Sequence, residues 1–304
     1  MKKLKILVTG GGKFAFNWTR YSNYKYENII VSKSDRHLFH ENTFIAMNLN
    51  HSNEVLGLIR DIKPDVIINS AAITNVNFCQ EFPTECNKIN TELALNLFDI
   101  ANSNKIKFIQ ISTDHFESHY LELRNELVRP VPINQYGFSK IRVDEVLKNN
   151  PSSLIIRTNF FGFAPDVLQN SFQDLHNHLT SGLPYPGITD IFYTPISLPI
   201  LIEAISKLIG LDYNGIINIS GNNNISKFSF AQVLAKELKL KTPIIDEINY
   251  ESLGFSVPRP KNMGLDNSKL LSILPDFPGD LTENIDLVLK HFENIPKIGK
   301  SSVW

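Results

Sequence analysis

A short apolar run that ends in consecutive glycines is the feature of this chain that most restricts its fold. Residues 5–8 read Lys-Ile-Leu-Val, and the turn Gly10-Gly-Gly12 follows within two positions. Aliphatic and β-branched residues in a run of this length favour a buried strand, and the glycines favour a tight turn into a helix. Gly10, Gly12 and Ala15 have the spacing with which such units bind the diphosphate of a dinucleotide. The pattern predicts an α/β fold that begins with a nucleotide-binding turn.

The same alternation of strand and helix continues through the first half of the chain. Short apolar runs predict buried parallel strands. They lie at residues 5–8, 29–32, 66–69, 108–112 and 154–157. Apolar residues recur at helical spacing in the segments between them, which span residues 52–62, 85–101 and 136–147. This order predicts a Rossmann-type, doubly wound parallel sheet.

The regular alternation of predicted strands and helices ends after about residue 160, where glycines and prolines become frequent. A helix over 198–209, a strand over 216–220 and a helix capped by Ser226 are predicted beyond them. We expect residues 1–160, with returning segments near 190–220, to form an NAD(P)-binding Rossmann domain. Residues from about 161 to 304 are expected to form mainly a smaller C-terminal lobe that binds the substrate.

Composition excludes several classes of partner. The formal net charge is −1, so the sequence predicts binding to neither nucleic acid nor an anionic membrane. No apolar run approaches the roughly 18 residues needed to span a bilayer. Cys79 and Cys86 form no metal-binding or disulfide pattern, and His176 and His178 lack the helical spacing of metal ligands. We expect a cytoplasmic protein without a metal.

Tyr136 and Lys140 indicate the chemistry. They are four positions apart in a predicted helix and therefore share one of its faces. A phenol titrates near pH 10, and a neighbouring ammonium lowers its pKa. Such a tyrosine can give a proton to a carbonyl oxygen while a nicotinamide supplies hydride. Thr113 ends a predicted strand, where catalytic groups of open α/β sheets are found.

The residues after the second predicted strand bear on the choice of cofactor. Val31 is followed by Ser32 and Lys33, and then by Ser-Asp-Arg at residues 34–36. A hydroxyl and two cations suit a 2′-phosphate, which favours NADP(H) over NAD(H). Asp35 is the alternative, because NAD enzymes place an acid here to bind the ribose 2′-hydroxyl.

Several short motifs, taken in order, resemble the extended short-chain dehydrogenases/reductases. Within them the chain resembles the dTDP-4-dehydrorhamnose reductase family of sugar-nucleotide-binding reductases. The motifs are Ile6–Gly10, Pro64–Ala72, Ile89–Asn90, Ile111–Asp114, Tyr136–Lys140, Arg157–Phe160, Ser226–Ala231 and Arg259–Asp266. They cover nearly the whole length of the chain.

The resemblance implies roles for individual residues. Thr113 would bind the keto oxygen, Tyr136 would be the acid, and Lys140 would hold the nicotinamide ribose and tune Tyr136. The implied cofactor-binding residues are Gly10, Gly12, Lys13, Phe14, Ser32, Lys33, Asn69, Ala71, Ala72, Asn90 and Lys140. The implied substrate-binding residues are Thr74, Asp114, His115, Asn159, Phe160 and Arg259. Of these, Arg259 suits the substrate diphosphate, because its guanidinium can bind two oxygens at once.

The chain departs from the family pattern at identifiable places. The family usually has Gln-Leu-Gly where this chain has Lys13-Phe-Ala15, and Gly-Glu where it has Val143-Asp144. The segment after Asp114 begins with His115 and differs from the family's Tyr-Val-Phe-Asp-Gly. Most departures lie near the expected substrate rather than near the hydride, so the resemblance supports a reductase more strongly than it supports rhamnose.

The resemblance implies an NADPH-dependent reductase of the C4 keto group of a nucleotide-linked 4-keto-6-deoxy sugar, in the biosynthesis of surface polysaccharide. Two alternatives stay open. One is a nucleotide-sugar epimerase or dehydratase that retains NAD. The other is a non-catalytic, NADP-binding regulatory subunit, as in the β subunit of methionine adenosyltransferase. The expected partner is a nucleotide sugar, and a homodimer also stays open.

Overall fold

The computed structural model describes residues 2–33, 38–39, 43–117, 123–165, 168 and 170–292. The chain folds into two compact units. Unit 1 comprises residues 1–113, 134–157 and 202–217, and unit 2 comprises residues 114–133, 158–201 and 218–304. Each unit is therefore assembled from segments that are distant in the sequence.

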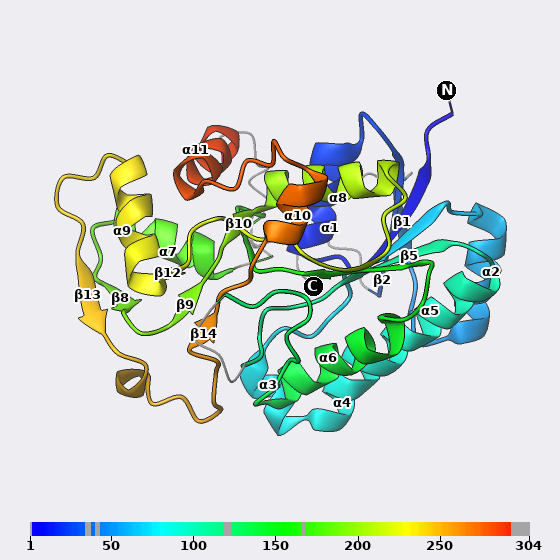
Figure 1. The fold of residues 1–304 in the computed structure, drawn as a ribbon, viewed down its shortest axis with the longest axis horizontal. Helices are drawn as coiled ribbons and strands as arrows, with labels where there is room; N and C mark the ends of the chain where they lie inside the picture. Colours follow the sequence, from blue (N-terminus) through cyan, green and yellow to red (C-terminus); the bar gives the residue numbers. More distant parts are fainter. Residues whose placement is uncertain are drawn as a thin grey trace. The chain divides into compact units, whose positions relative to one another are not determined.

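Unit 1 is built on a seven-stranded sheet in the order β11-β6-β5-β4-β1-β2-β3 among the described residues (Figure 1). Its strands are β1 (Lys5–Thr9), β2 (Glu27–Ser32), β3 (Phe44–Ala46), β4 (Val66–Asn69), β5 (Lys107–Ile111), β6 (Ser153–Arg157) and β11 (Gly215–Asn218). Strands β1 to β6 pair in parallel. The order reverses between β1 and β4, which is where doubly wound sheets place their ligands.

Helices cover both faces of this sheet. They are α1 (Lys13–Ser22), α2 (Ser52–Ile62), α3 (Val76–Glu81), α4 (Pro83–Asn87), α5 (Leu93–Ser103), α6 (Gln135–Leu147) and α8 (Leu198–Gly210), whose residues from Ile202 onward belong to unit 1. Figure 1 shows α1 and α8 on one face and α2, α5 and α6 on the other. The Tyr26 hydroxyl donates to the Ser206 carbonyl at 3.2 Å and so ties α8 to the turn after α1.

The buried residues of unit 1 explain the strand and helix patterns. Alternate residues of the strands, such as Leu7, Ile67 and Phe108, pack against the apolar faces of α2, α5 and α6. Strands covered on both faces need apolar residues at successive positions, which is why β4 reads Val-Ile-Ile-Asn. The fold class predicted from the sequence, a doubly wound α/β sheet, is confirmed.

The predicted helix over residues 85–101 is present but contains a π-helical turn, η2 (Lys88–Glu92), between α4 and α5. The extra residue of a π turn rotates the face of the helix. Asn90 and Thr91 of this turn are buried, and both bond to Ser139 of α6. Asn90 Nδ2 donates to the Ser139 hydroxyl oxygen at 3.0 Å, and Thr91 Oγ1 donates to the Ser139 carbonyl at 2.9 Å. The two helices are thereby fixed to each other.

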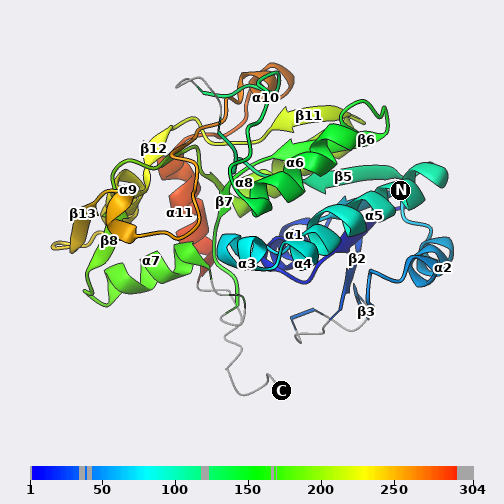
Figure 2. The same ribbon diagram turned by 90° about the horizontal axis from the view of Figure 1, so that it is seen from below.

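Figure 2 shows the short strands and the helices of unit 2, which also has a 3₁₀ turn over Glu251–Leu253. The strands are β7 (Phe160–Phe161), β8 (Tyr185–Ile188), β9 (Phe192–Tyr193), β10 (Ile196–Ser197), β12 (Ile225–Ser226), β13 (Ile245–Ile248) and β14 (Asn262–Met263). β7 pairs with β10, β8 with β13, and β9 with both β12 and β14. The helices are α7 (Ser171–Thr180), α9 (Lys227–Glu237), α10 (Ser268–Ile273) and α11 (Leu281–Phe292).

An aromatic core holds unit 2 together. Phe161, Phe172 and Phe230 lie with ring centroids 5.1–6.1 Å apart, within the range of favourable aromatic pairs. Residues 114–133, which the sequence analysis placed with the first domain, belong to unit 2. The Arg124 amide donates to the Gly264 carbonyl at 3.1 Å, and Asn218 Nδ2 donates to the Arg124 carbonyl at 2.8 Å. These bonds join the segment to residues far along the chain.

Candidate functional site

The turn after β1 has the geometry that the glycine pattern predicts. Gly10 has a φ of +90°, and a Cβ there would lie 2.9 Å from the Ala71 Cα, so only glycine fits without a backbone shift. Gly12 precedes α1, and a Cβ there would meet nothing within 4 Å. The Gly12 cap makes no side-chain hydrogen bond to the first turn of α1, which is the place where a dinucleotide diphosphate is held in such folds. The turn therefore fits a dinucleotide.

Replacement of Gly10 by alanine is expected to destabilise unit 1. The substitution places a Cβ against backbone atoms of the neighbouring loop and forces a residue with a side chain to keep a positive φ, which together cost about 2 kcal/mol or more. Gly57 is a matched control, because it is exposed on α2 and its Cβ would meet nothing within 4 Å. Gly57→Ala should stabilise the protein by about 0.5–1 kcal/mol.

Urea unfolding of both variants measures this difference. If Gly10→Ala and Gly57→Ala shifted the free energy of unfolding in the same direction, the close approach at Gly10 would have no energetic consequence.

The residues beside the turn contribute in different ways. The Lys13 carbonyl accepts from Asn17 Nδ2 at 2.9 Å within α1. The Phe14 ring is 4% exposed and stacks on Trp18, so only its backbone is available to a ligand. Ser32 ends β2 beside the turn: a Cβ on Gly11 would lie 3.0 Å from its hydroxyl oxygen.

The cofactor-selecting positions are described only in part. Lys33 is exposed at the end of β2. The remaining residues of that argument, Ser34, Asp35 and Arg36, lie outside the described residues.

Two asparagines expected at the cofactor hold the backbone around it. Asn69 is buried, and its Oδ1 accepts from Thr9 Oγ1 at 2.6 Å while its Nδ2 donates to Gln110 Oε1 at 2.9 Å. Asn90 bonds both backbone groups of Ile73, with Oδ1 accepting at 2.7 Å and Nδ2 donating at 2.9 Å. Their side chains therefore fix the loop that contains Ala71 and Ala72, both half-buried.

Helix α6 carries the two residues that the sequence assigns to proton transfer. Asn134 caps the helix, and its Oδ1 accepts from the Gly137 amide at 2.9 Å. Tyr136 is half-buried in the first turn, and Lys140 is buried one turn later. Lys140 Nζ donates at 2.7 Å to the carbonyl oxygen of Ile111, which is the last residue of β5. This bond fixes α6 to the end of β5. Thr113, which is buried, lies two residues beyond that end.

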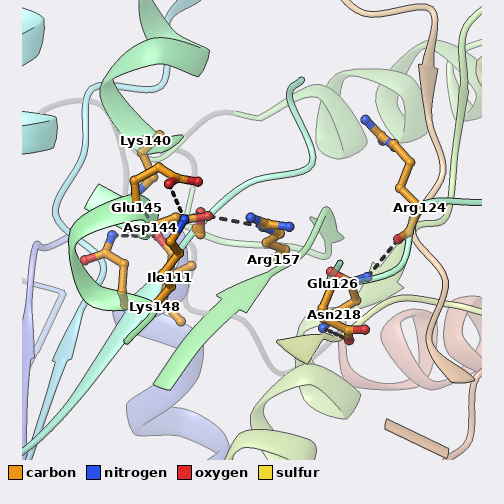
Figure 3. A network of polar contacts seen from close by, with 11 residues as sticks. Ile111, Arg124, Glu126, Lys140, Asp144, Glu145, Lys148, Arg157 and Asn218 are labelled. Atoms are coloured by element: carbon orange, nitrogen blue, oxygen red, sulfur yellow. Dashed lines mark hydrogen bonds and ion pairs between the residues drawn. The ribbon is translucent and has the colours of Figure 1, made fainter. Parts of the chain in front are cut away.

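A buried carboxylate lies behind Lys140 (Figure 3). Asp144 is fully buried; its Oδ2 pairs with Arg157 Nε at 3.2 Å, and its Oδ1 accepts from Ser112 Oγ at 2.7 Å. Burial lowers the pKa of Lys140 to about 8, and the Asp144 charge opposes that shift. Burial likewise raises the pKa of Asp144, although Arg157 favours its ionised form. The network supports the charged state of the lysine.

In unit 2, Asp114 and His115 follow directly after Thr113. Asp114 is buried, and its Oδ2 accepts from Asn159 Nδ2 at 2.7 Å. Burial raises the pKa of Asp114 to about 6. Burial lowers the pKa of His115 to about 4, with further lowering by the charges of Arg259, Lys227 and Arg124. His115 is therefore neutral near pH 7 and surrounded by cations.

Two of these cations, Arg124 and Lys227, have no role predicted from the sequence. Arg124 is 1% exposed and donates from Nε to the Gly264 carbonyl at 3.1 Å and from Nη1 to the Phe116 carbonyl. The Arg124 carbonyl accepts from the side-chain Nδ2 of Asn218 (Figure 3). The main-chain amide of Asn218 donates to Glu126 Oε1 at 2.8 Å. Lys227 is half-buried at the start of α9. A lysine directly after a capping serine was the available signal for Lys227.

The remaining expected substrate residues are spread over both units. Thr74 is exposed in unit 1, one residue before the Asn75 cap of α3. In unit 2, Phe160 forms β7 and pairs with Ile196 of β10. Arg259 is half-buried; its Nη1 donates to the Val257 carbonyl at 2.7 Å, and its guanidinium lies 4.0 Å from the centroid of the Phe255 ring. The charge of Arg259 also contributes to lowering the pKa of His115.

The described residues contain no group of three or more histidine, cysteine, aspartate or glutamate side chains that could hold a metal ion. His176 instead packs against the rings of Phe163 and Phe292. None of the described helices is long and apolar enough to cross a membrane.

Comparison with protein families gives a match over nearly the whole chain. Residues 4–294 match the model of the family described as the RmlD substrate binding domain. Among curated proteins, the dTDP-4-dehydrorhamnose reductase of Aggregatibacter actinomycetemcomitans is 23% identical over 91% of this chain and 95% of its own length. A probable low-salt glycan biosynthesis reductase of Haloferax volcanii is 24% identical over 74% and 76% of the two chains. Subunit beta of methionine adenosyltransferase 2 from Xenopus laevis is 26% identical over 75% and 70%.

Solved structures show the same fold. A dTDP-4-dehydrorhamnose reductase from Clostridium acetobutylicum superposes with a TM-score of 0.84 at 24% identity, over 95% of this chain and 100% of that chain. The enzyme of the same description from Bacillus anthracis, solved in complex with NADP, superposes with a TM-score of 0.82 at 22% identity and the same coverage.

Proposed function

We propose that this chain, which belongs to the RmlD substrate binding domain family of dTDP-4-dehydrorhamnose reductase-like extended short-chain dehydrogenases/reductases, reduces the C4 keto group of a nucleotide-linked 4-keto-6-deoxy sugar with NADPH. The observation that carries the proposal is the placement of Tyr136 and Lys140 on α6, with Lys140 bonded to the end of β5 just before Thr113. A tyrosine and a lysine one helical turn apart at a strand end are what acid catalysis beside a nicotinamide requires.

In the proposed reaction, a bound reduced nicotinamide supplies a hydride to C4. The Thr113 hydroxyl holds the keto oxygen, and Tyr136 donates its phenolic proton to that oxygen, so that the carbonyl becomes an alcohol. Lys140, kept charged by Asp144, stabilises the phenolate that remains until a proton from water restores it. Gly10 and Gly12 admit the dinucleotide diphosphate to the backbone, and Arg259 takes the diphosphate of the sugar nucleotide.

NADPH is proposed over NADH for two reasons. Ser32 and Lys33 at the end of β2 suit a 2′-phosphate, and the Bacillus anthracis relative was solved in complex with NADP. Asp35, the acid that would instead favour NAD by binding a free 2′-hydroxyl, lies outside the described residues.

The similarity to subunit beta of methionine adenosyltransferase 2 favours a second candidate function, a regulatory subunit that binds the cofactor without turnover. The presence of Thr113, Tyr136 and Lys140 together supports the enzyme instead. The two candidates differ in whether the cofactor is consumed.

The test follows the absorbance of NADPH and of NADH with enzymatically made dTDP-4-keto-6-deoxyglucose, with and without a 3,5-epimerase. We expect NADPH to be oxidised at a rate of the order of 1–10³ s⁻¹. Tight NADPH binding without oxidation of the cofactor, on this substrate and on its GDP-, UDP- and CDP-linked counterparts, would contradict the reductase and support the regulatory subunit.

A further inference from the structure

Three buried polar side chains form a row across the middle of the sheet in unit 1. Thr9 of β1, Asn69 of β4 and Gln110 of β5 are register partners, and each is at most 1% exposed. Thr9 Oγ1 donates to Asn69 Oδ1 at 2.6 Å, and Asn69 Nδ2 donates to Gln110 Oε1 at 2.9 Å. Strands covered on both faces usually carry apolar residues at such positions. Aliphatic side chains would fill the same space without burying polar groups, so the stability of the sheet alone does not explain the row.

The last member of this row shares an acceptor with Lys140. Gln110 Nε2 donates to the Ile111 carbonyl at 3.0 Å, and Lys140 Nζ donates to the same oxygen at 2.7 Å (Figure 3). A carbonyl oxygen has two lone pairs and can accept both donors at once. The side-chain amide of Gln110 and the ammonium of Lys140 therefore meet on one oxygen atom at the end of β5.

The direction of the hydrogen bonds along the row is fixed at both ends. At one end, Asn69 Oδ1 accepts from the main-chain amide of Ala71 at 3.3 Å. At the other end, Gln110 Nε2 donates to the Ile111 carbonyl. A main-chain amide can only donate and a carbonyl can only accept, so neither side-chain amide can be turned over without losing bonds. Gln110 therefore presents a donor, and not an acceptor, to the oxygen that Lys140 uses.

The position of the Lys140 ammonium matters for the neighbouring phenol. A lysine side chain has a flexible four-carbon stem, so a hydrogen bond to a fixed acceptor is needed to hold its charge in one place. The attraction between that charge and a developing Tyr136 phenolate falls with distance. Burial lowers the pKa of Lys140 to about 8, and the charges of Asp144 and Cys86 oppose that shift. These charges act on the protonation of the lysine, whereas the Ile111 carbonyl directs its ammonium.

We propose that Gln110 is a positioning residue for the reduction, because its side-chain amide holds the Ile111 carbonyl in the direction in which that carbonyl anchors the Lys140 ammonium. The inference deepens the proposed function and rests on it for the reaction that is served. Through Asn69, the same row of hydrogen bonds reaches Ala71, in the loop expected to lie at the cofactor. One set of buried side chains thus orders the cofactor loop and the lysine together.

NMR titration of the full chain without cofactor tests the shared carbonyl. The chain is labelled with ¹³C at the lysine Cε atoms and with ¹⁵N at the glutamine side-chain amides. The Lys140 signal is the one absent from Lys140→Arg, and the Gln110 signal is the one absent from Gln110→Met. We expect the Gln110 amide signal to shift with pH at the midpoint of the Lys140 titration, because loss of the ammonium proton changes the oxygen that both groups use. A Gln110 signal that stayed constant through that titration would overturn the inference.

Replacement of Gln110 tests the consequence for turnover. Gln110→Glu keeps an oxygen that can accept from Asn69, but a carboxylate oxygen then faces the Ile111 carbonyl and attracts the Lys140 ammonium. We expect kcat for NADPH oxidation to fall about ten- to a hundredfold, since small misplacements of catalytic groups have effects of this size. The KM for the keto sugar should change little, and the measured pKa of Lys140 should rise because a negative charge lies beside it. Gln110→Met, which removes the donor without adding a charge, should lower kcat to a similar extent.

Ser153→Ala is the matched control for a purely structural role. Ser153 is 0% exposed in β6, and its Oγ donates to the Leu147 carbonyl at 2.8 Å, so the variant also breaks a buried bond between the sheet and α6. It should lower the melting temperature but leave kcat and the pKa of Lys140 unchanged. Gln110 variants with the kcat of the wild type would overturn the inference. So would a Ser153→Ala protein that lost as much kcat as Gln110→Met.

These outcomes are separable from that of the proposed function, because the NMR titration requires neither a keto sugar nor hydride transfer. A chain that oxidises NADPH equally fast before and after Gln110→Glu would overturn only the positioning role. A chain whose Gln110 and Lys140 signals titrate together, but which oxidises no NADPH, would overturn the reductase and leave the shared carbonyl in place.

Discussion

Tyr136→Phe is expected to reduce the rate of NADPH oxidation by about two to four orders of magnitude, the usual contribution of a positioned general acid. The substitution removes one hydroxyl from a half-buried ring and leaves Lys140 bonded to the Ile111 carbonyl. Cofactor binding and the melting temperature should therefore stay close to those of the wild type. Comparison of kcat for the two proteins, at saturating NADPH and keto sugar, measures the effect.

Tyr24→Phe is the matched control for this prediction. Tyr24 is 79% exposed in the turn after α1, and loss of its hydroxyl should change neither turnover nor stability. A Tyr136→Phe protein that turned over substrate as fast as the Tyr24→Phe protein would remove Tyr136 from the mechanism. Unchanged behaviour in every functional assay would favour the regulatory subunit.

Asp144→Asn is expected to destabilise the folded protein by about 3–5 kcal/mol, the cost of removing one partner of a buried ion pair. Asp144 and Arg157 are 0% and 2% exposed, so the guanidinium would keep its charge out of water without its carboxylate. The loss of stability arises because the buried Arg157 charge no longer has the Asp144 carboxylate beside it. The Asp144–Arg157 pair need not itself be strongly favourable, because burial disfavours the ionised aspartate. Urea unfolding with linear extrapolation measures the change in free energy.

The double variant Asp144→Asn, Arg157→Gln separates this explanation from a general loss of packing. Removal of both charges should recover part of the stability that Asp144→Asn alone loses, as a double-mutant cycle reveals for coupled residues. Glu203→Gln is the matched control, since Glu203 and Lys207 form an exposed pair on α8 at 2.9 Å and contribute at most about 0.5 kcal/mol. An Asp144→Asn protein as stable as the Glu203→Gln protein would contradict the prediction.

Asp144 also shows how a departure from the family pattern is accommodated. The chain has Asp144 where the family pattern given by the resemblance has glutamate, four residues after Lys140. The shorter side chain is still held by Ser112 and Arg157 at the same time, at 2.7 and 3.2 Å. Asp144→Asn should consequently lower the pKa of Lys140 as well as the stability of the fold, since the Asp144 charge raises the pKa of that lysine.

The strands and most helices of unit 1 could be predicted because their signals are local. β1 and β4 contain the apolar runs Ile-Leu-Val and Val-Ile-Ile, and Gly10 needs a positive φ that its own backbone can supply. The π turn at Lys88–Glu92 carries no such signal. It is fixed by the contacts of Asn90 and Thr91 with Ser139 on another helix.

Unit 2 was harder to predict for the same physical reason. Its strands β9, β12 and β14 are two residues long, too short for an alternating pattern, and they are held by pairing with one another. The cations around His115 come from positions as distant as Arg124 and Arg259, and their electrostatic effect appears only when the chain has folded.

The sequence by itself determined the doubly wound fold, the glycine turn after β1 and the spacing of Tyr136 and Lys140, because backbone sterics and helical periodicity act over a few residues. Only the tertiary structure decided that Asp144 would meet Ser112 and Arg157 in a buried network. It likewise decided that Lys227 would lie on Tyr193 beside Asp114. These groups are far apart in the chain, and burial and charge act between them only after the chain has brought them together.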